Sequence, residues 1–103
     1  AEPKNSKIKS LKINVRLLDQ KDINERNLPK KTTGVVITKI DDDSLINYLN
    51  INDIIVEAQK QSIRTIHQLE NIVNAAIRSK EKTILIAIYN NQNQRRYIGV
   101  KLD

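Results

Sequence analysis

The sequence is 103 residues long, which allows one domain and leaves no room for a second hydrophobic core. It has no cysteine, so disulfide bonds and thiolate metal sites are excluded. The 18 basic and 12 acidic residues give a net charge of +6, but these charges are dispersed along the chain. The aromatic residues are three scattered tyrosines, which are too few for a base-stacking platform, so nucleic acid is not expected as a partner.

The first part of the chain is expected to hold a linker, a strand and a short helix. Residues 1–9 are polar and lysine-rich, which is typical of a linker or a frayed N-terminus, and they lack the apolar stretch of a signal peptide. Residues 11–18 alternate apolar and polar side chains, the pattern of a half-buried strand. Asp19 then offers a helix N-cap, and Pro29 stops that helix after one or two turns.

The middle of the chain predicts a strand, a second short helix and another strand. Residues 34–40 are rich in β-branched side chains, which favour a strand. Residues 41–49 are expected to form a short helix, because Asp43 or Ser44 can cap it and acidic side chains suit its positive end. The apolar run at 54–56 is typical of a buried strand.

The clearest predicted element is a helix over residues 65–80, preceded by a tight turn at 59–61 and a short return strand. Thr65 and Gln68 fit the S/T-x-x-E/Q capping box at its start. Its apolar side chains form one stripe at helical spacing: Ile66, Leu69, Ile72, Val73, Ala76 and Ile77. This helix therefore has one face suited to a core or a groove.

Residues 82–89 and 95–102 are expected to form two strands, and the polar turn between them predicts a closing β-hairpin. The apolar run from Ile84 to Tyr89 is far shorter than the ~20 residues that span a bilayer, so no membrane insertion is expected. The order of elements indicates an α+β fold. We expect a five- to six-stranded curled antiparallel sheet, or partly open barrel, with one short and one long helix.

Residues that carry catalysis in other proteins are sparse. His67 is the single histidine and has no cysteine partner, and no serine lies in a G-x-S-x-G elbow. The acidic triplet 41–43 lacks the spacing and the distal glutamate of a calcium loop. With only Gly34 and Gly99, no glycine-rich loop can cradle a phosphate. We therefore expect no enzymatic activity from this chain, no metal and no cofactor.

The string YLNINDIIVEAQKQSIRTIHQLENIV is similar to the PDZ-domain pattern G-L-x-x-G-D-x-I, followed by a short strand and a helix. Leu49, Asp53 and Ile55 keep that pattern, while Tyr48 and Asn52 stand in the two glycine places. The acid matches the PDZ "G-D" turn, where we expect it to accept backbone N–H bonds as architecture and not as chemistry. Asparagine tolerates the left-handed backbone that the second glycine place implies.

Upstream, LKINVRLLDQKDINERNLPKKTTGVVITKI looks like the bacterial form of the domain, and RRYIGVKLD resembles its closing strand. The resemblance covers about residues 10–103 and points to the PDZ domain of an HtrA (Do-type) serine protease, most like the second, C-terminal one. It implies that residues 1–9 lie outside the domain and that the parent protein is a serine endoprotease. It also implies a bacterial periplasmic location, and the heavy use of Ile, Asn and Lys is typical of an AT-rich genome.

The resemblance implies a peptide groove between the strand that begins near residue 11 and the long helix. Backbone N–H groups of the loop before the strand would bind a terminal carboxylate, and the strand edge would pair with an extended peptide. Lys12 stands where glycine is common, so a loop that binds weakly or not at all stays an open alternative. The implied peptide-binding residues are Leu11, Lys12, Ile13, Asn14, Val15, Ile66, His67, Leu69, Glu70 and Val73.

Two functions follow from the resemblance. In the first, the domain captures peptides or unfolded proteins with apolar C-termini and delivers them to a protease domain, or regulates that domain, in protein quality control. In the second, it is mainly an assembly element that contacts other subunits and binds peptide weakly or not at all. Both leave the chain itself without catalytic residues.

Overall fold

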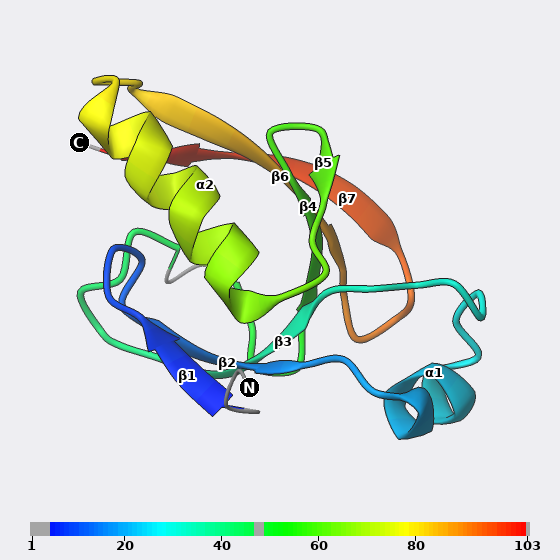
Figure 1. Cartoon of the computed structure of the whole chain (residues 1–103). Helices are drawn as coiled ribbons and strands as arrows, with labels where there is room; N and C mark the ends of the chain where they lie inside the picture. The colour runs from blue at the N-terminus through cyan, green and yellow to red at the C-terminus, as the bar shows by residue number, and fades with distance from the viewer. Residues whose placement is uncertain (1–4, 47–48, 103) are drawn as a thin grey trace.

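The computed structural model describes residues 5–46 and 49–102, whose strands form one curled antiparallel sheet (Figure 1). The sheet order is β1-β2-β3-β4-β6-β7, and β5 pairs with β4 off this path. In chain order the elements are β1 (Asn5–Ile8), β2 (Ile13–Leu17), α1 (Gln20–Arg26), β3 (Val35–Ile40), β4 (Ile54–Ala58), β5 (Gln61–Ser62), α2 (Ile66–Arg78), β6 (Thr83–Tyr89) and β7 (Arg95–Lys101). The predicted α+β class, with a curled sheet, one short helix and one long helix, is confirmed.

The local signals explain most of these elements. The Asp19 side chain accepts the N–H of Asp22, whose own side chain accepts the N–H of Asp19, so a reciprocal capping box starts α1. Asn27 ends α1 in the left-handed conformation, with φ of 54°. The predicted hairpin is present as β6 and β7, paired in continuous register from Thr83↔Lys101 to Tyr89↔Arg95.

The core lies between α2 and the concave face of the sheet. One large cluster joins buried residues of β1, β2, β3, β4, β6 and α2, and its largest fully buried side chains are isoleucine and leucine. A smaller cluster lies under α1, where Ile23 and Leu28 pack against Val36, Ile54 and Val56. Strands β3 and β4 contribute residues to both clusters and are thus buried from both sides, which agrees with their continuous apolar runs.

Two segments differ from the sequence-based expectation. Residues 5–8, expected to belong to a linker or frayed terminus, form strand β1 against β2. The described part of 41–49 forms turns and no helix. The Ser44 hydroxyl donates to the carbonyl oxygen of Leu11 at 2.5 Å and accepts the N–H of Ile46 at 3.1 Å, so it holds a turn against a distant loop and does not cap a helix. Tyr48 lies outside the described residues.

Candidate functional site

Strand β2, the expected acceptor of a peptide, has a partner on both sides. On one side it pairs with β3, from Ile13↔Ile40 to Leu17↔Val35, with an irregularity between Asn14 and Val15. On the other side it pairs with β1, and this edge is the one that was expected to receive a peptide. The paired residues of β1 and β2 are Asn5↔Arg16, Ser6↔Val15, Lys7↔Asn14 and Ile8↔Ile13.

The loop between β1 and β2 directs two successive backbone N–H groups at one oxygen. The carbonyl oxygen of Ile8 accepts the N–H of Leu11 at 3.1 Å and the N–H of Lys12 at 2.8 Å. Lys12 has φ of 56°, the left-handed region that glycine enters most easily. The loop therefore forms a small nest of donors suited to an oxygen or an anion.

The Lys12 side chain does not point a free charge into this nest. The Lys12 ammonium nitrogen lies 2.5 Å from Oδ2 of Asp43. This hydrogen bond lowers the pKa of the Asp43 carboxyl group. Lys7 makes a similar bridge of 3.0 Å to Asp41, and the Asp41 N–H donates to the carbonyl oxygen of Lys12. Asp41 and Asp43 thus bridge to the β1–β2 hairpin, and the sequence alone did not indicate these contacts.

The wall that faces β1 and β2 comes from α2. Ile66, Leu69 and Val73 are buried and belong to the same cluster as Leu11, Ile13 and Val15, so these six predicted site residues come together. Asn14 and Glu70 are half-buried, whereas Lys12 and His67 are exposed. At the far end of the hairpin loop, Ser10 Oγ donates to Asn74 Oδ1 of α2 at 2.6 Å.

The start of α2 is capped, but only half of the predicted capping box forms. Thr65 Oγ1 accepts the N–H of Gln68 at 3.0 Å, as expected. The Gln68 side chain accepts the N–H of Arg64 at 2.7 Å and donates to the carbonyl oxygen of Ser62, instead of reaching Thr65. The helix is therefore tied to the preceding strand β5 as well as to its own cap.

Asp53 has the architectural role that was predicted. It is 1 % exposed, and its Oδ2 accepts the N–H of Asn50 at 3.0 Å. Asn52 has φ of 78°, so it takes the left-handed conformation in the glycine place. The Asn52 N–H donates to the backbone carbonyl oxygen of Ile37 at 2.8 Å, and the Ile37 N–H donates to the backbone carbonyl oxygen of Asp53 at 2.9 Å. These two bonds join the turn to β3. The acid therefore shapes entry into β4.

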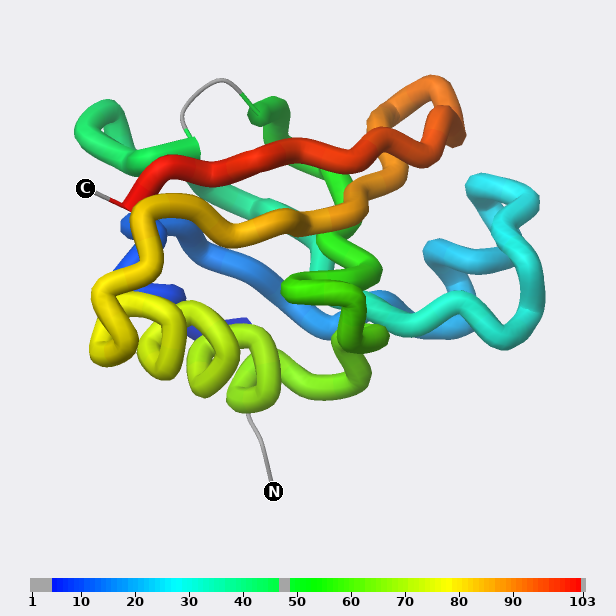
Figure 2. Tube along the Cα trace, turned by 90° about the horizontal axis from the view of Figure 1, so that it is seen from above, coloured from blue at the N-terminus to red at the C-terminus, as the bar shows by residue number. Residues whose placement is uncertain are grey.

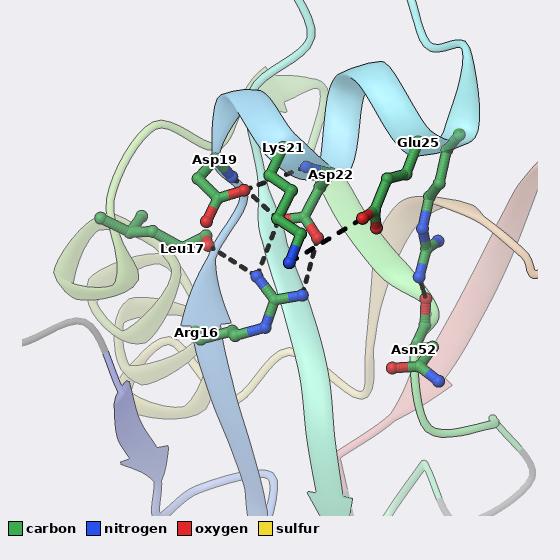
Figure 3. A network of polar contacts seen from close by, with 8 residues as sticks. Arg16, Leu17, Asp19, Lys21, Asp22, Glu25 and Asn52 are labelled. Atoms are coloured by element: carbon green, nitrogen blue, oxygen red, sulfur yellow. Dashed lines mark hydrogen bonds and ion pairs between the residues drawn. The ribbon is translucent and has the colours of Figure 1, made fainter.

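A polar network at the other end of β2 holds α1 in place (Figure 3). Arg16 makes two hydrogen bonds of 2.7 Å to the two carboxylate oxygens of Asp22, which is the bidentate arrangement. These bonds hold the pKa of Asp22 well below its usual range. Arg26, at the end of α1, donates to the carbonyl oxygen of Asn52 at 2.6 Å, so the helix also braces the Asp53 turn.

A hollow lies on another part of the surface, beside Arg95. Arg95 bridges to Glu57 at 2.6 Å and lies over the rings of Tyr89 and Tyr97, 5.8 and 5.5 Å from their centroids. No sequence pattern predicts this hollow, because its residues come from distant strands and loops. The hollow, about 270 Å³ in volume, is lined by Pro29, Lys31, Thr32, Thr33, Val56, Glu57, Ser62, Tyr89 and Arg95.

Among the residues that the structure describes, no group of three or more His, Asp or Glu side chains is placed to hold a metal ion. Within the same residues, neither helix is long and apolar enough to cross a membrane.

No family model and no curated protein matches the sequence. Among solved structures, the chain is similar to one described as an HtrA-type protease AlgW with decapeptide, with a TM-score of 0.62 and 20% sequence identity. The match covers 88% of this chain and 27% of that one, so the chain spans about a quarter of the length of the protease it resembles. The likeness supports a PDZ-like fold of the kind found in HtrA-type proteases.

Proposed function

We propose that this chain is a non-catalytic PDZ module of an HtrA-type serine protease that captures extended or C-terminal apolar peptide segments. The observation that carries the proposal is the convergence of the Leu11 and Lys12 N–H groups on one oxygen, beside a strand edge and a buried apolar wall. Backbone pairing at such an edge supplies affinity, and a pocket for the terminal side chain supplies specificity. The solved protease with the similar fold is described with a bound decapeptide.

The proposal extends to the parent protein. The module would deliver peptides or unfolded proteins to a protease domain, or regulate that domain, in quality control in a bacterial periplasm. The full-length sequence tests this part. A preceding domain with a catalytic His, Asp and G-N-S-G-G serine motif, together with another PDZ domain, supports it, and an unrelated neighbour contradicts it.

An NMR titration with peptides ending in an apolar residue tests the binding function. We expect chemical-shift changes at residues 11–15 and 66–73, where the strand and the helix wall meet. Absence of any change there at millimolar peptide would contradict peptide capture. A peptide of the same sequence that ends in aspartate is the control, because its terminal side chain does not suit the apolar wall.

The second candidate function, assembly between subunits, is favoured by one observation. The edge of β2 that would receive a peptide is already paired with β1. A domain that does not bind peptide can keep this edge closed permanently and use its outer surface for contacts. Sedimentation of the isolated chain distinguishes the two functions, since assembly predicts a concentration-dependent oligomer and peptide capture does not require one.

A further inference from the structure

Strand β1 makes the contacts that an incoming peptide would make. It runs antiparallel to β2 on the side away from β3, through the pairs Ser6↔Val15, Lys7↔Asn14 and Ile8↔Ile13. Figures 1 and 2 show it at the end of the sheet that α2 covers. Addition of a strand to a free sheet edge is a general mode of peptide recognition, and here the added strand belongs to the chain itself.

The carbonyl oxygen of Ile8 takes the place of a terminal carboxylate. It accepts the N–H groups of Leu11 and Lys12, the donors that the resemblance assigns to carboxylate binding. A peptide that ended at this position would present a charged oxygen to the same two donors. Hydrogen bonds to charged groups are stronger than those between neutral groups, so the nest would favour a free carboxylate over this carbonyl.

The Ile8 side chain takes the place of the apolar terminal residue. It is 0 % exposed and packs in the same cluster as Leu69 and Val73 of α2. Asn5 and Lys7 are exposed, so Ile8 is the one anchor that β1 inserts into the core. A single buried isoleucine at the end of an extended segment is the pattern that an external peptide would have to reproduce.

We infer that β1 is an internal ligand of the groove between β2 and α2, and that the groove's external ligand is an extended peptide with a free C-terminal isoleucine or valine. The inference rests on the proposed function, because it assigns the occupant and the ligand class of that site. Capture then requires β1 to leave. The observed affinity is lowered by the fraction of molecules in which β1 occupies the groove.

The contacts of β1 suit a segment that can leave without unfolding the domain. It contributes four residues, of which one is buried. Its ion pair, Lys7–Asp41, has side chains that are 49% and 24% exposed, and such pairs contribute little stability. Segments with few buried contacts open at lower free-energy cost than the core does.

A reversible lock tests the inference in the full chain. Lys7 and Asn14 lie directly opposite each other in register, and facing residues in antiparallel strands are about 4.5–5.5 Å apart, a separation that a disulfide can bridge. The chain has no cysteine, so the double variant Lys7→Cys/Asn14→Cys can form only this intramolecular bond. Oxidation holds β1 in the groove and reduction frees it, which makes the reduced protein its own control.

The probe is a fluorescent hexapeptide, PKNSKI, copied from residues 3–8 and ending in a free carboxylate. Fluorescence anisotropy should show binding to the reduced variant and a loss of about tenfold or more on oxidation. The variant Ile8→Asp places a charge in the apolar site, which should expel β1 and raise affinity for the probe above that of the unmodified chain. The amidated hexapeptide should bind more weakly than the free acid to each form.

Equal binding of the hexapeptide by the oxidised and reduced forms of the double cysteine variant would show that β1 is not an internal ligand. It would still allow peptide capture at another surface. No binding by any form, with Ile8→Asp still folded by NMR, would overturn the internal ligand and the proposed function together. Hydrogen exchange on the unmodified chain provides a readout that does not depend on folding of a variant. Amides of β1 should exchange faster than those of β2, and equal protection would make β1 a permanent part of the core.

Discussion

Asp22 should make the stability of the domain depend on pH in the acidic range. Its pKa is lowered by the hydrogen bonds from Arg16, so the folded state favours the charged carboxylate. The stabilisation is complete above the ordinary carboxyl pKa of about 4 and is lost as pH falls toward the lower folded value. Asp22→Asn should reduce the free energy of unfolding by about 2 kcal/mol at neutral pH, because a bidentate charged pair is lost.

Urea unfolding at several pH values measures this effect. The gap between the unmodified chain and Asp22→Asn should shrink below about pH 4, since the Asp22 carboxyl group then binds a proton in the unfolded state, while Arg16 keeps it charged in the folded state. Glu25→Gln is the control, because its pair with Lys21 has side chains that are 63% and 80% exposed. That change should stay within about 0.5 kcal/mol. A gap that does not depend on pH would contradict the assignment.

Asp53 is the second residue whose role can be separated from binding. Asp53→Ala removes the buried acceptor of the Asn50 N–H and should lower the free energy of unfolding by about 1–2 kcal/mol. Asn50→Ala keeps that N–H and should change stability by less than about 0.5 kcal/mol. Because Asp53 lies in the turn before β4, peptide affinity should be unchanged in both variants. Loss of binding by a folded Asp53→Ala protein would show that the acid is part of the site.

At the scale of elements, the approach of β3 to β4 depends on Gly34. A Cβ atom built on Gly34 would lie 2.5 Å from the carbonyl oxygen of Ile55, which is backbone and cannot move aside easily. Gly34→Ala should therefore lower the free energy of unfolding by about 2–3 kcal/mol. Gly99→Ala is the matched control, since its Cβ would meet no atom within 4 Å. Chemical denaturation followed by circular dichroism compares them, and equal stability of the two variants would contradict the close approach.

Elements whose apolar pattern extends over many residues could be predicted from the sequence. Elements that depend on contacts with residues distant in sequence could not. α2, β2 and the β6–β7 hairpin carry their pattern over many residues, which is enough to assign their type. β1 has a single buried residue, Ile8, and its burial depends on α2. The predicted helix at 41–49 was wrong because the Ser44 hydroxyl bonds to Leu11, more than 30 residues away in sequence.

The same reasoning applies to the candidate site. The sequence placed the residues of β2 and α2 on a common groove because both carry an apolar pattern that a family resemblance could align. It did not reveal the occupant, since nothing in residues 5–8 marks them as a strand. The left-handed φ of Lys12 could not be predicted either, because lysine has no preference for this conformation. The hydrogen bonds of the loop impose it.

At the scale of the whole molecule, the surface bears on the choice between capture and assembly. Among the described residues, the large hydrophobic side chains that are exposed are Ile51 in the turn before β4, Ile77 in α2 and Tyr97 in β7. Stable subunit interfaces need a contiguous, partly apolar area, which scattered side chains do not provide.

The outer edge strand β7 also disfavours assembly. It carries Arg95, Arg96 and Lys101, and charged side chains on an edge strand discourage its pairing with another copy of the chain.

The net charge of +6 adds repulsion between copies of the chain. We therefore predict that the isolated domain sediments as a monomer, with and without the hexapeptide. Sedimentation equilibrium at low and at physiological salt measures this, because screening weakens the repulsion and would reveal association that charge alone prevents. A dimer that persists in physiological salt would favour the assembly function. A dimer abolished by Ile8→Asp but not by charge reversal on β7 would point to exchange of β1 between copies, since a strand that can leave its own groove can also enter another.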